Sequence, residues 1–408
     1  MSPRELPTDA GIRALIAQAG AWRVGRRTVL QGAGVSAAAL ALAACSTGGG
    51  GGAAKPSAAA DKSDSDKTLT WANWSFYIDE DDEGNYPTLQ AFQEESGLTV
   101  TYDVAVDDNN TYYAKVKDQL ALGQDIGADV VCLTDWMISR LIGQGYVQKL
   151  DHANIPNLSN LTPSLQNPDF DEGREYSVPW QSGFAGLAWN KEKLPNGLTS
   201  VEELWDPALK GRVGVLSEMR DTMGLLMLAQ GIDISSSDWG DEEFAAAIEV
   251  FQQQVSSGQI RNIKGNSYAD DLKNEDTLAA IVWSGDITTI NGELGEEKFG
   301  FALPDTGGTL WSDNFMVPIG SPRKTNAEKL IDFYYRPEIA AEVAAYVNYI
   351  TPVEGAKEAM ADIAPELVEN QLIFPNEETL AKAHIFRTLT NAEQTRYQAD
   401  FESVGLGA

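Results

Sequence analysis

The sequence contains few of the residues on which hydrolytic and metal chemistry usually depend. Only two histidines, His152 and His384, occur in 408 residues, and they lie far apart, with no spacing typical of metal ligands. The chain also lacks a G-x-S-x-G elbow, a P-loop and an H-E-x-x-H sequence. These absences argue against an enzyme, so no catalytic residue, cofactor or metal ion is expected.

Long hydrophobic runs are missing too. The apolar run at residues 32–44 is shorter than the roughly 20 residues that a membrane-spanning helix needs. It follows Arg26-Arg27, an order typical of a secretory signal, and the paired arginines suggest twin-arginine export. The run ends in Leu42-Ala43-Ala44-Cys45, which resembles the lipobox of bacterial lipoproteins. Residues 1–45 are therefore predicted to be a signal peptide, with Cys45 lipidated.

A segment rich in Gly, Ala and Ser follows the predicted lipidation site. Its composition over residues 46–67 is typical of a flexible linker. A lipidated Cys45 and a linker together predict a domain anchored to the cell membrane from outside the cytoplasm, in the periplasm or on the outer face.

Basic residues are scarce. The chain has 30 Lys and Arg against 60 Asp and Glu, and removal of residues 1–44 leaves 25 against 58, a formal charge of −33. Such a charge would repel nucleic acid and attract a small cation, although it also serves solubility alone. Once Cys45 is lipidated, Cys132 is the only thiol. No intramolecular disulfide is expected, and Cys132 is predicted to be buried in its apolar run.

About 340 residues follow the linker, which is enough for two domains of ordinary size. Short β-type runs alternate with amphipathic helices, a pattern typical of the α/β class. Thr325 and Glu328 are expected to form a capping box for a helix that ends at Arg336. The predicted strands are TLTWANW, LTVTYDV, DVVCLT, VGVL and LAAIVW, and the predicted helices cover residues 87–96, 110–122, 136–142 and 244–255.

Aromatic residues, often beside a carboxylate or hydroxyl, stand at the ends of predicted strands. An open α/β sheet presents its binding crevice at such ends. Each tryptophan alone is as well explained by core packing, but the repetition favours a binding site. The clusters are NWSFY (Trp74, Ser75, Tyr77), TDW (Thr134, Trp136), SEMRD (Glu218, Asp221), WSGD (Trp283, Asp286) and LWSD (Trp311, Asp313).

A polyamine would explain this combination. Its protonated amines need carboxylates as charge-assisted partners, and its methylene chain needs flat apolar walls. An ammonium over an aromatic ring gains about 0.5 to 2 kcal/mol, and a hydrogen bond to a charged group contributes about 1.5 to 3 kcal/mol. Two separated carboxylates would then select ligands whose amines have a matching spacing, and they would reject neutral analogues.

The chain resembles the spermidine/putrescine-binding proteins of bacterial polyamine ABC importers. The resemblance implies a type II periplasmic-binding-protein fold, in which two α/β lobes joined by crossover strands close on the ligand. It also implies an ABC permease and its ATPase as partners, and a monomer is expected. The lobes are predicted at residues 68–184 plus 312–343 and at 185–311 plus 344–408. The resemblance is carried by TLTWANWSFYI, YYAKVKDQLALGQDIGADVV, GYVQKLD, EYSVPW, SVEELWDPALKGRVGVL, IVWSGD, LWSDNFMVPIG and YITPVEGAKE.

The resemblance also implies a role for each residue of the predicted site. Asp313 is the acid expected to matter most. Aromatic walls are assigned to Trp74, Trp136, Trp283 and Trp311 with Tyr77 and Tyr349, hydroxyl contacts to Ser75 and Thr134, and amine contacts to Glu218, Asp221, Asp286 and Asp313.

Two departures leave the ligand open. Phe76 stands where relatives carry an acid, and Phe386 falls near a glutamine of the spermidine type. Three alternatives to a polyamine remain: the same fold binding a carbohydrate, the same fold binding another organic cation, and a secreted hydrolase with paired carboxylates.

Overall fold

The computed structural model describes residues 55–406. The predicted signal peptide, Cys45 and residues 46–54 of the predicted linker lie outside the described residues. Among the residues described, no helix is both long and apolar enough to cross a bilayer.

The first lobe is built on three parallel strands, with β1 between β2 and β3. Its helices begin and end at residues suited to those positions: Pro87 opens α2, and Gly97 closes it in a left-handed conformation with φ 68°. Asp108 caps α3 by accepting from Thr111 N. The elements are β1 (Thr68–Trp74), α2 (Pro87–Ser96), β2 (Thr99–Val106), α3 (Asn109–Ala121), β3 (Val130–Thr134), α4 (Asp135–Gln144) and α9 (Lys324–Tyr334).

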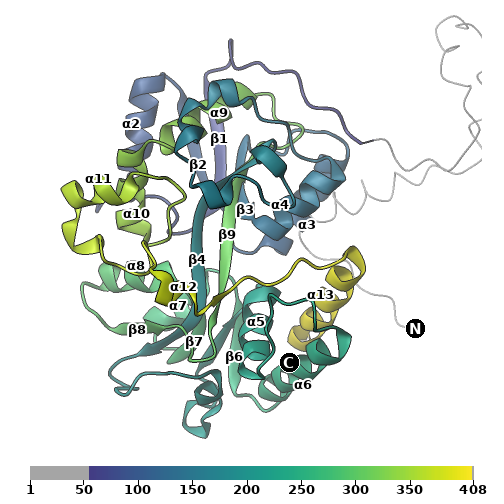
Figure 1. Ribbon diagram of the computed structural model, residues 1–408, viewed down its shortest axis with the longest axis vertical. Helices are drawn as coiled ribbons and strands as arrows, with labels where there is room; N and C mark the ends of the chain where they lie inside the picture. The colour runs from purple at the N-terminus through teal and green to yellow at the C-terminus, as the bar shows by residue number, and fades with distance from the viewer. Residues whose placement is uncertain (1–54, 407–408) are drawn as a thin grey trace, which may run out of the picture. The chain divides into compact units, whose positions relative to one another are not determined.

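The second lobe repeats this arrangement with β5 between β6 and β7, again parallel. Figure 1 shows α5, α6 and α13 grouped beside these strands. The elements are β5 (Val213–Leu216), α5 (Met219–Ala229), α6 (Asp241–Ser256), β6 (Ile260–Lys264), α7 (Tyr268–Lys273), β7 (Ala279–Trp283), α8 (Ser284–Leu294), β8 (Phe299–Ala302), β10 (Ala383–His384) and α13 (Asn391–Leu406).

Two long antiparallel strands, β4 (Ser177–Asn190) and β9 (Gly308–Met316), join the lobes. The N-terminal part of β4 and the C-terminal part of β9 continue the first lobe, because β9 pairs with β3 from Asp313 to Met316. The opposite parts continue the second lobe, where β4 pairs with β7 from Ala185 to Trp189. In Figure 1 both strands run through the middle of the molecule, between the two groups of helices.

Three further α-helices follow α9 in the sequence. α10 contacts α2 and α9 of the first lobe and α8 of the second. These helices are α10 (Pro337–Val347), α11 (Ala356–Ile363) and α12 (Glu377–Leu380), and short 3-10 helices occupy His152–Asn154, Pro156–Asn160, Pro163–Leu165, Glu172–Arg174, Val201–Trp205, Pro207–Leu209 and Pro365–Leu367.

The predicted capping box at the start of α9 is wrong, and the contacts that replace it show that part of the predicted linker is folded. Thr325 and Glu328 form no capping box; Glu328 instead accepts from Asp151 N at 2.7 Å. The first turn of α9 is capped by residues of the predicted linker, since Ser63 Oγ accepts from Asn326 N at 3.1 Å and Asp61 Oδ2 from Thr325 N at 3.2 Å. Unsatisfied N–H groups at a helix start take whatever acceptor the fold offers. Residues 59–66 therefore belong to the folded domain, and α9 ends at Tyr334 rather than at Arg336.

Candidate functional site

A cavity of about 860 Å³ lies between the lobes. It is lined by the strand ends of both lobes, because β1 and β3 end at Trp74 and Thr134 and β7 ends at Trp283. The carboxyl ends of parallel strands are where α/β proteins bind ligands. All twelve residues that the sequence predicted for the site line this cavity: Trp74, Ser75, Tyr77, Thr134, Trp136, Glu218, Asp221, Trp283, Asp286, Trp311, Asp313 and Tyr349.

One face of β9 supplies three of the lining residues. Side chains alternate between the two faces of a strand, so Thr309, Trp311 and Asp313 point the same way, and all three line the cavity. Opposite Trp311 on β4 stands Gly183. A Cβ at this position would lie 2.5 Å from the Trp311 ring and 2.6 Å from the Tyr349 ring. Glycine at position 183 therefore makes room for two aromatic walls.

The aromatic walls meet across the lobes. Trp74, from the first lobe, lies with its ring centroid 5.8 Å from that of Trp283, from the second, in an edge-to-face arrangement. Tyr349 packs edge-on against both Trp311 and Tyr77, at 5.0 and 5.5 Å. Such a box offers flat apolar surfaces and the negative faces of aromatic rings, which suit methylene chains and organic cations.

Asp313 is the acid with an incomplete set of partners. Its Oδ2 accepts from the Tyr77 hydroxyl at 2.8 Å. Its Oδ1 is buried and has no donor at ordinary hydrogen-bond geometry among the described residues. Burial, with a smaller contribution from Asp135 and Asp221, raises the pKa of Asp313 to about 7, although the hydroxyls of Thr134 and Tyr77 oppose the rise. A cation beside Oδ1 would satisfy this oxygen and restore the charge.

Asp286 has a complete set of partners. Its Oδ1 accepts from the Tyr349 hydroxyl at 2.6 Å, and its Oδ2 accepts from the Tyr268 hydroxyl at 2.8 Å and from Asn266 Nδ2 at 2.9 Å. Burial raises its pKa to about 6 against these three hydrogen bonds. Asp286 thus orients the Tyr349 wall as well as lining the cavity.

The two acids at the start of α5 have different partners. Asp221 accepts from Thr309 Oγ1 at 2.6 Å and from Trp283 Nε1 at 2.9 Å, so it orients an aromatic wall. Glu218 Oε1 accepts from the main-chain N and the side-chain Nδ2 of Asn109, at 3.0 and 2.9 Å. Burial raises the pKa of both acids, and the nearby Asp108 raises that of Glu218 further.

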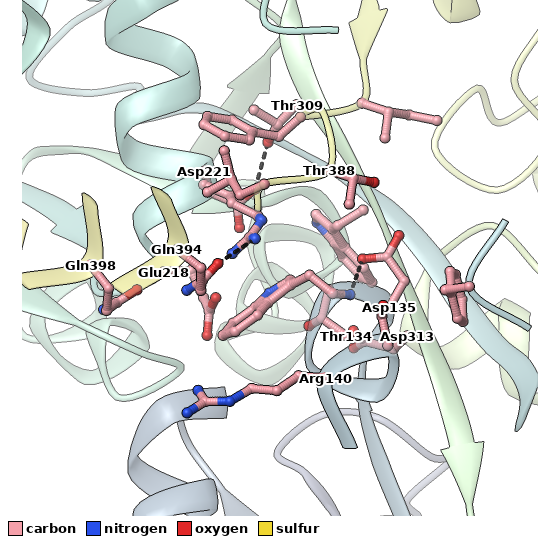
Figure 2. Close-up of a pocket in the computed structure, with 18 of the residues that line it drawn as sticks. Thr134, Asp135, Arg140, Glu218, Asp221, Thr309, Asp313, Thr388, Gln394 and Gln398 are labelled. Atoms are coloured by element: carbon pink, nitrogen blue, oxygen red, sulfur yellow. Dashed lines mark hydrogen bonds between the residues drawn. The ribbon is translucent and has the colours of Figure 1, made fainter. Parts of the chain in front are cut away.

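A cationic side chain lies inside the cavity. The Arg220 guanidinium lies over the Trp136 ring, 4.3 Å from its centroid, and donates to Gln394 Oε1 at 2.6 Å. Figure 2 shows Gln394 and Glu218 on one side of the cavity and Thr134, Asp135 and Asp313 on the other. Burial lowers the pKa of Arg220 to about 10 against the charges of Asp135, Glu218 and Asp221. Trp136 therefore stacks on a cation of the protein itself.

The sequence missed several residues of the site. Two of them, Asp135 and Arg220, stand inside the clusters TDW and SEMRD but were given no role. The others carried no strand-end or aromatic pattern: Arg140 of α4, Thr309 of β9, Thr388, and Gln394 and Gln398 of α13. Asn109 does not line the cavity but holds two residues that do.

Phe76 and Phe386, the two residues that depart from the pattern of the family, have different surroundings. Phe76 does not line the cavity, and Lys273 Nζ lies 5.6 Å from its ring centroid. Phe386 does line it and packs edge-on against Trp239, at 5.3 Å. The cavity thus has an apolar side chain at Phe386.

Metal or nucleophile chemistry finds no support in this part of the chain. Within residues 55–406, no three His, Cys, Asp or Glu side chains gather as metal ligands would. Cys132 is buried, and burial raises the pKa of its thiol well above the usual range.

Comparisons with known proteins agree with this geometry. The family model described as bacterial extracellular solute-binding protein matches residues 88–373. The spermidine/putrescine-binding periplasmic protein of Salmonella typhimurium is 27% identical over 325 residues, 79% of this chain and 87% of that protein. The putrescine-binding periplasmic protein PotF of Escherichia coli is 26% identical over 333 residues, 78% and 85% of the two chains. A solved structure from Listeria monocytogenes, described as a candidate spermidine/putrescine ABC transporter, is 25% identical, with a TM-score of 0.71 over 84% of this chain and all of that one.

Proposed function

Because this chain belongs to the bacterial extracellular solute-binding proteins, we propose that its cavity binds a polyamine and delivers it to a membrane permease. The two-lobed periplasmic-binding-protein fold and the resemblance to polyamine-binding proteins, both predicted from the sequence, are confirmed. The chain is the substrate-binding component of an ABC importer and not an enzyme.

The unsatisfied oxygen of Asp313 is the observation that carries the choice of ligand. A buried carboxylate oxygen without a donor costs free energy, and a protonated amine would remove that cost. Tyr77, Trp311 and Tyr349 surround this acid with rings, which suits the methylene groups next to the amine. Neutral sugars would supply hydroxyl donors but no charge.

Among polyamines, the short diamine putrescine fits the site better than spermidine. Arg220 already places a cation over Trp136, beside Glu218 and Asp221. A third ammonium group at this place would lie beside the positive charge of Arg220, because the Trp136 ring is already covered by the guanidinium. Phe386, an apolar residue at the wall, also removes a polar contact from that part of the cavity.

Closure of the lobes on the ligand is the proposed mechanism. The lobes, at residues 68–184 plus 312–343 and at 185–311 plus 344–408, would move about β4 and β9. Ligand contacts to Asp313 and Trp74 of one lobe and to Trp283 and Glu218 of the other would favour the closed form, because only that form offers all of them.

We further propose that the protein is a lipoprotein attached through Cys45, exported through Arg26-Arg27 and acting as a monomer. The support is the segment Leu42-Ala43-Ala44-Cys45 and the Gly-rich run after it. A Cys45→Ser variant should leave the membrane fraction and accumulate in the soluble extracytoplasmic fraction. Unchanged membrane association would reject the anchor.

Calorimetric titration of the purified domain, residues 55–408, tests the ligand choice. Putrescine should bind most tightly, spermidine more weakly, and maltose not at all. Binding of maltose without any amine would reject the proposal. Tighter binding of spermidine than of putrescine would reject the role given to Arg220 and leave the polyamine assignment intact.

A further inference from the structure

Asn109 is a buried residue that contacts the cavity residues of both lobes without lining the cavity itself. It is the first residue of α3 and is fully shielded from solvent. Its Oδ1 accepts from Thr134 N at 3.1 Å, and its Nδ2 donates to Thr134 Oγ1 at 2.8 Å. The same Nδ2 and the main-chain N donate to Glu218 Oε1 of the second lobe at 2.9 and 3.0 Å.

The direction of these hydrogen bonds is determined by chemistry. A main-chain N–H can only donate, so Thr134 N fixes Oδ1 of Asn109 as the acceptor and thereby the orientation of the amide. The two hydrogens of Nδ2 then serve Thr134 Oγ1 and Glu218. Because Thr134 Oγ1 accepts from Nδ2, its own proton is free for another acceptor. Thr134 stands opposite Asp313 in the pairing of β3 with β9, so their side chains lie on the same face of the sheet, and the Thr134 hydroxyl opposes the rise in the pKa of Asp313.

We propose that the hydrogen-bonded series Glu218–Asn109–Thr134, called the relay below, ends at Thr134 opposite Asp313 and sets the separation of the two acids, which makes Asn109 the positioning residue for a ligand with two amines. This inference rests on the proposed function. At one end of the relay Asn109 donates twice to Glu218, and at the other end the Thr134 hydroxyl keeps its proton beside Asp313. The relay therefore suits two ionised acids at a fixed separation, one from each lobe.

The relay leaves one oxygen of each acid for the ligand. Asp313 Oδ1 has no donor, and Glu218 Oε2 accepts no hydrogen bond from any residue within 55–406. Neighbouring contacts hold the lobes together at the same place, since Ser217 Oγ donates to Asp108 Oδ2 at 2.9 Å and Ser267 N to Asp107 Oδ1 at 3.0 Å. A ligand with one amine needs only one acid. A diamine needs both acids at a separation that matches the distance between its two amines.

The test compares putrescine with n-butylamine, which has the same carbon chain and one amine. An Asn109→Asp variant keeps the shape of the side chain and removes both amide donors. It should weaken putrescine binding roughly 30-fold, the loss of a hydrogen bond to a charged group, and n-butylamine binding less than about threefold, because that ligand needs Asp313 alone. Asn110→Asp, which adds the same charge one residue away, is the matched control and should change neither affinity by more than about twofold.

A double variant separates a relay from two independent effects. When Glu218→Gln is combined with Asn109→Asp, the loss of putrescine affinity should stay close to that of the more damaging single variant. Independent residues would multiply their losses. If Asn109→Asp does not fold, Asn109→Ser, which also lacks the amide, takes its place.

Four outcomes decide the matter. Equal losses for putrescine and n-butylamine would overturn the relay and leave a structural role for Asn109, and so would multiplied losses in the double variant. Absence of amine binding by the unaltered protein would overturn the proposed function and the relay with it. Selective loss of putrescine binding with a normal melting temperature would support both.

Discussion

Asp313 and Asp286 face the same cavity from the two lobes, and they differ in how many of their oxygens the protein itself satisfies. Both side chains are almost fully buried, and burial raises the pKa of both, to about 7 and about 6. The protein provides three donors for Asp286 but leaves Oδ1 of Asp313 without one at ordinary geometry.

The difference between the two acids teaches that burial alone does not mark a binding residue. A buried carboxylate with donors for both oxygens is partly compensated for its burial and holds its neighbours in place. A buried carboxylate with a missing partner is costly until a cation arrives. Free energy released at Asp313 on binding would then favour the closed form.

Asp313→Asn is expected to have the largest effect on ligand binding. It should weaken putrescine binding about 100-fold, because the amine then lies buried without its counter-ion. Titration calorimetry of both proteins measures the loss. Affinity unchanged within error would remove Asp313 from the binding site.

The same variant should also raise the melting temperature of the protein without ligand, because it removes the buried charge of Asp313. The folded-state pKa, about 7, lies above the ordinary value of 3.8, so the folded protein binds the proton more tightly and loses stability as pH rises through this window. The neutral amide of the variant carries no such penalty. The variant without ligand should therefore melt at a higher temperature than the natural protein at pH 8, and the advantage should shrink at pH 5. A lower melting temperature of the variant at pH 8 would contradict the claim that the unpartnered Oδ1 of Asp313 destabilises the folded protein.

The pH dependence of binding should show the second largest effect. Asp313 must lose its proton to pair with an ammonium, and its pKa is about 7 before the ligand binds. Putrescine affinity should therefore be roughly tenfold weaker at pH 6 than at pH 8. Asp313→Asn should remove most of this dependence, whereas a profile centred near pH 4 would show that the carboxylate is already satisfied.

Asp286→Asn is expected to have the smallest effect on affinity, about fivefold or less, and a larger effect on the fold. If the NH₂ group of the amide takes the place of Oδ2, it faces two other donors, the Tyr268 hydroxyl and Asn266 Nδ2. In either orientation of the amide, the loss of the negative charge weakens the hydrogen bonds that remain. The free energy of unfolding should fall by about 1 to 3 kcal/mol, as measured by urea denaturation without ligand. A loss of affinity as large as that of Asp313→Asn, with normal stability, would reverse the roles assigned to the two acids.

Much of the fold was predictable, because the hydrophobic period and the end signals of its elements are local. The strands at Thr68–Trp74 and Val213–Leu216 and the helix at Pro87–Ser96 coincide with the predicted segments. The start of α9 was not predictable in the same way. Its first N–H groups bond to Asp61 and Ser63, more than 260 positions earlier in the chain, and no local pattern announces such a partner.

The membership of the cavity was also largely predictable, whereas the role of each member was not. The sequence assigned amine contacts to four acids and ranked Asp313 first, but it gave the other three the same role. Only their donors distinguish them: Asp221 and Asp286 orient the walls at Trp283 and Tyr349, and Asp313 keeps an oxygen without a partner. Arg220 escaped notice because nothing in SEMRD indicates that its guanidinium covers the Trp136 ring.

The sequence by itself determined the α/β class, the strand-end position of the aromatic and acidic residues, and the resemblance to a family of solute receptors, because each depends on neighbours along the chain. The tertiary structure decided which carboxylates are satisfied, where Arg220 lies and how Asn109 joins the two lobes. Hydrogen bonds and burial depend on partners that folding brings from distant parts of the chain, and these contacts determine which acid has an oxygen available to a cation.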